Sequence, residues 1–160
     1  MKFNYYAFRA MYLHEMDRFK RTLMQSLFSP VLSTSLYFIV FGSVIGGYVE
    51  KIDGISYGSF IVPGLLMLTL LTQSISNTSF GIFFPKFNGT IYEILAAPIS
   101  TFEIVLAFVG AGATKTLIVG LVIFLTSIFF VEVQVMYPLL MIFLLVLVAF
   151  TFALFGFLIG

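Results

Sequence analysis

The sequence predicts an all-α integral membrane protein, and two properties of the chain indicate this class. Hydrophobic residues make up 61% of the chain and charged residues 9%, whereas a soluble domain carries about 25% charged residues. The apolar residues also fall in blocks long enough to cross a bilayer, which takes about 20 residues per helix. We therefore expect one membrane domain over residues 1–160, with an N-terminal interfacial helix, four transmembrane helices and a short cytoplasmic helix between the second and third.

The first expected element is an amphipathic helix over about residues 5–28. Its apolar side chains recur at steps of three or four and share one side of a helix: Phe8, Tyr12, Met16, Phe19, Leu23 and Leu27. Asp17, Arg18 and Arg21 project from the other side, which is typical of a helix that lies in the interface against membrane lipids. The alternative is the charged beginning of an ordinary spanning helix. Ser29-Pro30 is expected to end the pattern.

Four blocks with few or no charges follow, and each is long enough to span a bilayer. They cover about residues 31–49, 59–84, 104–131 and 136–160. Pro63 is expected in the first turn of the second span, where its missing N–H has little effect. The blocks therefore predict four spans.

The third block contains one cation, Lys115, and two interpretations of it are open. Residues 110–113 read Gly-Ala-Gly-Ala and could break the helix, so that the span begins near Thr114 and the ammonium reaches the cytoplasmic surface. Alternatively, Lys115 faces a polar cavity or a partner helix inside the membrane. We prefer the first interpretation.

Basic residues gather on one side of this predicted topology. Six of the eight lie in the N-terminal segment and the 85–103 loop: Lys2, Arg9, Arg18, Lys20, Arg21 and Lys86. Because cytoplasmic loops carry an excess of Lys and Arg, we expect the N-terminus and residues 85–103 in the cytoplasm and residues 50–58 and 132–137 outside. The expected location is the plasma (inner) membrane of a bacterium.

The second span carries the densest set of polar side chains, and most of them share one broad helix face. That stripe consists of Thr69, Thr72, Gln73, Ser76, Asn77 and Ser79. Ser74 and Thr78 are expected off it. The stripe either hydrogen-bonds neighbouring helices, which is the more frequent use of such residues in membranes, or lines the route of a transported substrate.

Small residues recur at four-residue steps, a spacing that lets helix backbones approach closely. The sets are Gly42 with Gly46, Gly112 with Thr116 and Gly120, and Gly156 with Gly160. They predict helix–helix contact, either within the chain or between two copies.

No spacing in the chain assembles a set of catalytic or metal-binding residues. There is no cysteine, and the single histidine, His14, lies on the amphipathic helix beside Glu15 and Asp17, so we expect a surface histidine. A Gly-rich phosphate loop of the GxxxxGKS or GxxxxGKT kind is missing from the sequence, so we expect no nucleotide cofactor bound by this chain. The net charge of +1 argues against a nucleic-acid partner.

The 84–103 segment is the most informative part of the sequence. It reads Phe-Pro-Lys-Phe-Asn-Gly-Thr-Ile-Tyr-Glu-Ile-Leu-Ala-Ala-Pro-Ile-Ser-Thr-Phe-Glu. It resembles the loop between the second and third spans of type-2 ABC (ATP-binding-cassette) exporter permeases, which typically contains Gly-Thr, a Glu, a Leu pair, Pro-Leu-Ser and a further Glu. The matching positions are Gly89, Thr90, Glu93, Leu95, Pro98, Ser100 and Glu103. The order of the other elements also matches, so the resemblance covers the whole chain.

This resemblance implies a permease subunit that pairs with a second permease subunit, as a homodimer, and with two ATP-binding subunits that use ATP. It implies six spans per permease, so we expect this chain to be truncated at its C-terminal end. The 84–103 loop would then be the coupling element, with a short helix from Thr90 to Ala97 ended by Pro98. The candidate ATPase contacts are Gly89, Thr90, Tyr92, Glu93, Leu95 and Pro98, and the candidate substrate path is Thr69, Thr72, Gln73, Ser76 and Asn77.

Two other classes of function stay open from the sequence. One is a membrane-embedded enzyme that modifies lipids, which would need acid, base or metal-binding residues from several spans. The other is a structural or assembly membrane protein without a transported substrate. The sequence does not identify a substrate.

Overall fold

The computed structural model describes residues 3–45, 57–131 and 135–160, and within these ranges every regular element is a helix. The elements are α1 (Tyr5–Arg21), α2 (Leu23–Tyr37), the π-helical stretch η1 (Phe38–Ile45), α3 (Tyr57–Phe87), α4 (Ile91–Ala96), α5 (Thr101–Phe130) and α6 (Pro138–Ile159). Four segments are long and apolar enough to cross a membrane: Leu23–Phe41, Tyr57–Phe87, Thr101–Phe130 and Pro138–Ile159. The predicted all-α integral membrane class is confirmed. Gly46, Lys51, Asp53 and Glu132 lie outside the described residues.

The amphipathic helix ends earlier than the sequence indicated. α1 stops at Arg21, where the Thr22 backbone N–H bonds to Phe19 O and its hydroxyl donates to the carbonyls of Arg18 and Phe19. Pro30 does not end a helix but lies inside α2. A proline removes only one backbone hydrogen bond from a helix. The other backbone groups of a helix that crosses lipid must be paired within the helix, so α2 continues through Pro30. The first span therefore begins before Pro30.

Helices α3 and α5 are longer and more continuous than the sequence indicated. Pro63 lies well inside α3 and not in its first turn, and residues 110–113 are ordinary turns of an unbroken α5. Each helix has about 30 residues and is thus about 45 Å long at 1.5 Å per residue. This length exceeds the roughly 30 Å of a hydrocarbon core, so part of each helix extends beyond it.

Helices α5 and α6 both pack on α3 through small residues. A Cβ added to Gly112 would overlap Thr78 Oγ1, and one added to Gly156 would lie 2.5 Å from the carbonyl oxygen of Ile75. Gly120 faces Leu70 in the same way. The helix contact predicted from these glycines is therefore confirmed, and it is a contact within the chain.

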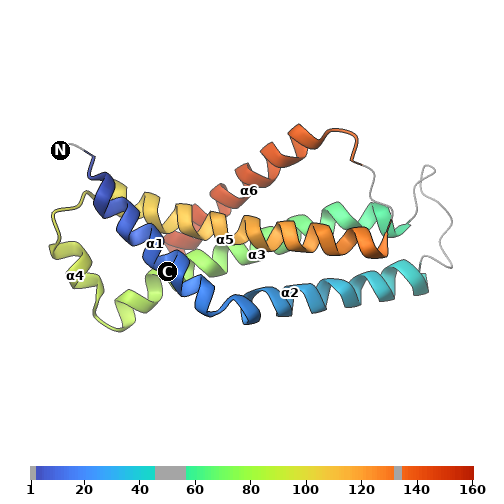
Figure 1. The fold of residues 1–160 in the computed structure, drawn as a ribbon, viewed down its shortest axis with the longest axis horizontal. Helices are drawn as coiled ribbons and strands as arrows, with labels where there is room; N and C mark the ends of the chain where they lie inside the picture. The colour runs from blue at the N-terminus through green and yellow to red at the C-terminus, as the bar shows by residue number, and fades with distance from the viewer. Residues whose placement is uncertain (1–2, 46–56, 132–134) are drawn as a thin grey trace.

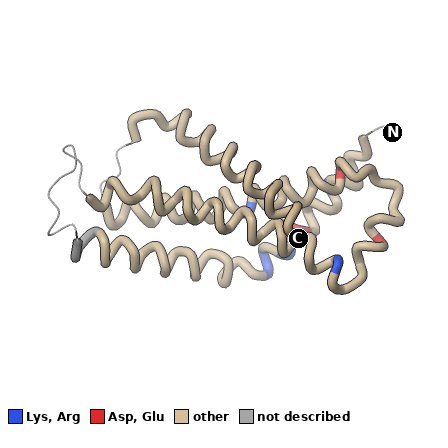
Figure 2. Tube along the Cα trace, turned by 180° about the vertical axis from the view of Figure 1, so that it is seen from behind, with Lys and Arg blue, Asp and Glu red and all other residues tan. Residues whose placement is uncertain are grey.

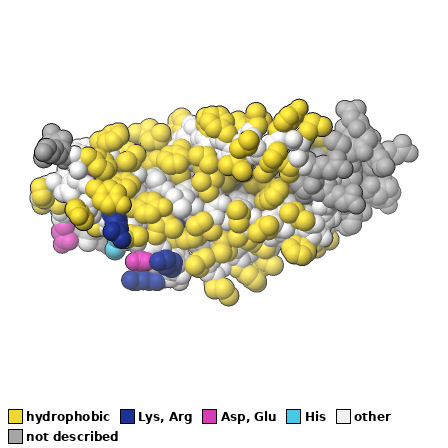
Figure 3. All heavy atoms as spheres, turned by 45° about the horizontal axis from the view of Figure 1, so that its top comes forward, with side chains coloured by type: hydrophobic (Ala, Val, Ile, Leu, Met, Phe, Trp, Pro, Cys, Tyr) yellow, Lys and Arg dark blue, Asp and Glu magenta, His cyan; other side chains and the backbone are white. Residues whose placement is uncertain are grey.

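The charged residues that the structure describes gather toward one end of the molecule. In Figure 1, α1, α4 and the N-terminus lie at the same end, while α2, α3 and α5 run side by side away from it. The charged positions in Figure 2 lie in the half of the molecule that holds α1, α4 and the N-terminus, and in Figure 3 hydrophobic side chains cover most of the visible face. The described charged residues are Arg9, Glu15, Asp17, Arg18, Lys20, Arg21, Lys86, Glu93, Glu103 and Lys115. This end is the candidate functional site.

Candidate functional site

The short helix α4 has an inner and an outer side. Ile91 and Ile94 pack against a cluster formed by Ile82 of α3 and by Ile104 and Phe108 of α5. Tyr92 and Leu95 project outward and are 74% and 61% exposed. Helix α4 is therefore fixed to α3 and α5 by its inner side, and its outer side exposes two large apolar side chains.

The ends of α4 follow from its flanking residues. Gly89 has a φ of +79°, a conformation that favours glycine, and it turns the chain from α3 into α4. Ala97 is extended, as expected for a residue before proline, so α4 ends ahead of Pro98. Thr90 and Glu93 are exposed beside Tyr92. The predicted short helix is present, and its contact with an ATPase stays a prediction.

Glu103 fastens the beginning of α5 and the N-terminus together. Its backbone N–H donates to Ser100 Oγ at 3.3 Å, and its carboxylate accepts from the Ser100 N–H at 2.9 Å, which forms a capping box. The other carboxylate oxygen accepts from the backbone N–H of Asn4. Two members of the loop motif therefore have a structural role at the start of α5.

Lys115 is not at the surface, so the preferred interpretation of this residue is wrong. Its Nζ lies 2.7 Å from Glu15 Oε2 of α1, and the side chains of Lys115 and Glu15 are only 4% and 5% exposed. Because α5 is unbroken, Lys115 stays among packed helices, and a carboxylate of a neighbouring helix neutralises it. The second interpretation, a partner helix, is confirmed.

The Glu15 carboxylate has a second cationic neighbour. Arg18 Nη1 lies 3.3 Å from Glu15 Oε1, and the Arg18 guanidinium lies over the Phe84 ring of α3 at 5.7 Å. A second ion pair of α1, between Lys20 and Asp17, is exposed and lies outside this cluster. There, Lys20 Nζ donates to Asp17 Oδ1 at 2.9 Å and holds the pKa of that carboxyl below its ordinary value.

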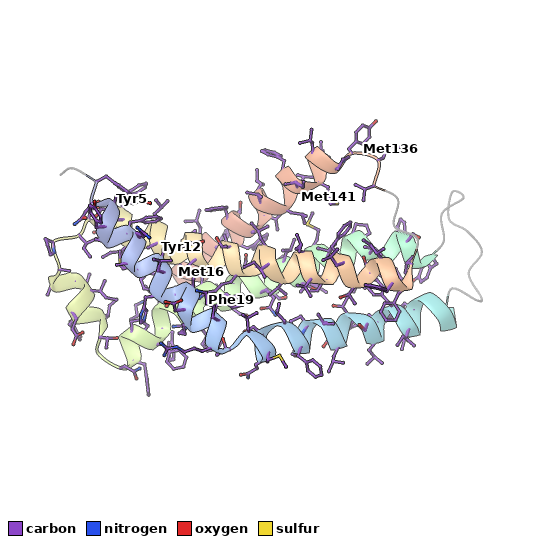
Figure 4. All side chains as sticks on the ribbon, viewed as in Figure 1. Tyr5, Tyr12, Met16, Phe19, Met136 and Met141 are labelled. Carbon is purple, nitrogen blue, oxygen red and sulfur yellow. The ribbon has the colours of Figure 1, made fainter. Side chains whose placement is uncertain are left out.

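Helix α1 lies alongside the first half of α5. Going along α1, Asn4 bonds to Glu103, Tyr12 OH to Thr114 Oγ1 at 2.9 Å, and Glu15 to Lys115, so the contacts ascend in the same order on both helices. The labelled side chains of Tyr12, Met16 and Phe19 follow α1 toward α2 in Figure 4. Phe19 is buried in the main core, and Met16 packs against it. The apolar side of α1 therefore faces protein.

A pocket of about 710 Å³ lies between α1 and the segment that runs from the end of α3 into α4. Its wall on the α1 side includes His14, Glu15 and Arg18, and its other wall includes Phe84, Pro85, Asn88, Thr90, Glu93 and Ile94. His14 is exposed, as predicted. In residues 3–45, 57–131 and 135–160 no three His, Cys, Asp or Glu side chains meet as a metal site.

The polar stripe of the second span lies on the free side of α3. Thr72 and Ser76 are exposed, and Thr69, Gln73 and Asn77 are half-buried. Thr69 and Thr72 donate to carbonyls of their own helix, and Asn77 Nδ2 donates to Gln73 Oε1 at 3.4 Å. Ser79 differs from the rest of the stripe, because α6 packs on it through Gly160. Of the other five residues, Thr72 and Ser76 face outward, and Thr69, Gln73 and Asn77 lie half-buried beside them.

Sequence reasoning missed three polar residues that pack the bundle. Ser74 and Thr78 are buried, and Ser74 Oγ donates to Ala149 O of α6 at 2.9 Å. Glu15 was noted only as a neighbour of His14. Its spacing was a usable signal, since it lies three residues after Tyr12 and four before Phe19, on the apolar side of the helix.

A bundle of apolar spanning helices whose described charged residues lie toward one end is typical of a polytopic membrane protein, the class that includes transporter permeases. The sequence profile of the family described as "ABC-2 type transporter" matches residues 6–160, and the chain belongs to this family. It is 40% identical over 129 residues to the "Inner membrane transport permease YadH" of Escherichia coli (strain K12), and the YadH proteins of Escherichia coli O157:H7 and Shigella flexneri match equally.

Each of these matches covers 81% of this chain and 50% of the relative. The chain therefore spans about half the length of the curated relatives that it matches. No solved structure matches the chain.

Proposed function

We propose that this chain forms a membrane-spanning permease subunit of an ATP-binding-cassette exporter. Family membership supports this function, and the name of the YadH relatives supports a location in a bacterial inner membrane. ATP is bound and hydrolysed in this proposal by partner subunits, and a second permease copy completes the path. The N-terminus and α4 lie in the cytoplasm.

The observation that carries the proposal is the two-sided packing of α4. Ile91 and Ile94 connect α4 to α3 and α5, whereas Tyr92 and Leu95 are free to bind a partner. A force applied to the outer side of such a helix is passed to both spans through its inner side. The proposed contact comprises Gly89, Thr90, Tyr92, Glu93, Leu95 and Pro98.

Thr69, Thr72, Gln73, Ser76 and Asn77 of the α3 stripe are the proposed lining of the substrate path. Their hydrogen bonds stay within α3 among the described residues, so packing inside this chain does not account for them. A polar side chain exposed in a span needs water, substrate or another subunit beside it. The stripe leaves the chemical class of the substrate open.

Co-purification of the ATP-binding subunit with the permease tests the coupling contact. Truncating an aromatic anchor at an interface commonly costs more than about 1 kcal/mol, so Tyr92→Ala is expected to weaken retention of the ATPase about fivefold or more. Leu95→Asp is expected to abolish retention, because it places a charge in an apolar contact. Membrane insertion is expected to stay normal, since neither residue belongs to a span.

Asn88→Ala is the control, because Asn88 is exposed in the same loop but lies before the turn at Gly89. Retention of the ATPase should not change in this variant. Unaltered retention and transport in both the Tyr92 and Leu95 variants would overturn the coupling role of α4.

A further inference from the structure

The Glu15–Lys115 ion pair is buried where three helices meet. Helix α3 passes it at Gly81, where an added Cβ would lie 3.5 Å from Glu15 Oε2. A buried ion pair adds little net stability, because the lost hydration of both charges offsets their attraction. The best-attested effect of such pairs is to select one arrangement of the elements that carry them.

Helix α1 has few other contacts that fix its position along α5. Its apolar side chains, such as Met16 and Phe19, bind through non-directional contacts, which tolerate a shift of the helix. The hydrogen bonds from Tyr12 and Asn4 to α5 are only partly buried, so water can replace them. A shift by one turn, about 5.4 Å, would instead separate two buried charges.

We propose that Glu15 and Lys115 form a register lock, a charge pair that fixes where α1 lies along α5. The lock also positions α4, because Met11 of α1 belongs to the same packed cluster as Ile91, Ile94 and Phe108. The register of α1 follows from the geometry alone. Only the consequence for ATPase coupling rests on the proposed function.

Because Arg18 also lies beside Glu15, replacing Glu15 and replacing Lys115 should displace α1 to different extents. If Lys115 is replaced, the Glu15 carboxylate keeps Arg18 at 3.3 Å. If Glu15 is replaced, Lys115 stays buried, and the described residues offer no other carboxylate to it. Glu15→Gln is therefore expected to displace α1 more strongly than Lys115→Met.

The register can be measured with two spin labels, because the chain has no native cysteine. Leu13→Cys on α1 and Leu125→Cys on α5 are exposed positions outside the lock. The purified protein should give one narrow distance distribution. The neutral double variant Glu15→Gln/Lys115→Met still folds, since an uncharged pair replaces a charged one, but it should show a second population shifted by about 5 Å, one helical turn.

The reversed pair Glu15→Lys/Lys115→Glu, combined with Arg18→Gln so that no second cation lies beside position 15, should restore the narrow distribution, because it keeps opposite charges at the same two positions. Asp17→Asn is the matched control, since it removes an acid from the exposed pair with Lys20 on the same helix, and it should change nothing.

An unshifted distribution in the neutral variant, or a reversed pair that does not restore it, would overturn the lock. If the neutral variant does not accumulate in the membrane, the single variants Glu15→Gln and Lys115→Met test the proposal instead. Equal displacement of α1 in both single variants would contradict it. These distances are measured without an ATPase, so they stand even if the coupling role of α4 fails.

Discussion

Gly112 of α5 packs directly against Thr78 of α3. Thr78 is buried, and its hydroxyl has no hydrogen-bond partner among the described residues. A Cβ on Gly112 would overlap that hydroxyl and lie 3.1 Å from the Thr78 Cβ. A glycine inside a helix costs about 1 kcal/mol relative to alanine, so close helix packing is the physical reason for this one.

Gly112→Ala is therefore expected to destabilise the protein by about 1–3 kcal/mol, the typical effect of overpacking. Thr78→Ala in the same chain should restore most of the loss, because it removes the overlapping hydroxyl. Thermal unfolding in detergent measures both effects.

Gly64→Ala is the matched control, since no atom lies within 4 Å of its added Cβ. It should leave stability unchanged or raise it by about 0.5–1 kcal/mol through helix propensity. A Gly112→Ala protein as stable as this control would contradict the packing argument.

Single residues were the hardest features to predict from the sequence. The face of the second span that carries Thr72 and Ser76 was recognised, but Ser74 and Thr78, which bind the bundle together, were placed off it. Periodicity shows which residues share a side of a helix, but not which side the neighbouring helices cover. That choice depends on where α5 and α6 pack.

At the scale of elements, the start of α5 also binds the segment before α1, because the Glu103 carboxylate accepts from the Asn4 N–H. Replacing Ser100 by Ala removes only the cap, which typically costs about 1 kcal/mol. Replacing Glu103 by Ala keeps the bond to Ser100 Oγ, because the backbone N–H of residue 103 donates it, but removes the carboxylate that accepts from the N–H groups of Ser100 and Asn4. Hydrogen exchange should therefore rise in the first turn of α5 in both variants, but at the start of α1 only in Glu103→Ala.

Phe102→Ala is a control for that experiment, because Phe102 is exposed in the same turn and takes no part in the cap. Faster exchange at the start of α1 in Ser100→Ala, equal to that in Glu103→Ala, would show that the two ends are not joined through the carboxylate.

The existence of the helices was predictable from sequence, and their ends were less so. Long apolar blocks predict spans because the bilayer sets a minimum length. Pro30 and the glycines of residues 110–113 looked like helix breaks, yet α2 and α5 continue through them. The actual break at Thr22 depends on a side-chain hydrogen bond that many threonines could make.

At the scale of the whole molecule, the free side of α3 can be tested for water access. If the stripe lines a path, Thr72→Cys and Ser76→Cys should react with a water-soluble thiol reagent. Leu121→Cys and Leu125→Cys are controls, because these side chains are also exposed but lie on the apolar surface of α5. Equal protection of all four positions would remove the stripe from the proposed path.

A water-soluble thiol reagent that cannot cross the membrane also reports the orientation of the chain in intact cells. With α4 in the cytoplasm, Asn88→Cys should react only after the membrane is permeabilised, and Asp53→Cys should react at once. The physical reason is the bias of basic residues toward the N-terminal segment and the 85–103 loop. The opposite labelling pattern would invert the topology and exclude the coupling role of α4.

The assembly of the helices was beyond sequence reasoning, although its ingredients were visible. The lysine of the third block has no acidic partner within reach along the chain, and Glu15 has only Arg18, three residues later. Their pairing joins residues 100 positions apart, and no local pattern encodes such a distance.

That separation also sets an order of events during biogenesis. At about 5–20 residues per second, a ribosome needs roughly 5–20 s to travel from Glu15 to Lys115. Throughout this time Glu15 has no Lys115 to pair with, and a lysine that enters the membrane unpaired costs about 3 kcal/mol at the centre of a helix. Helix α1 thus leaves the ribosome well before α5, and its register can be fixed by Lys115 only after α5 has been synthesised.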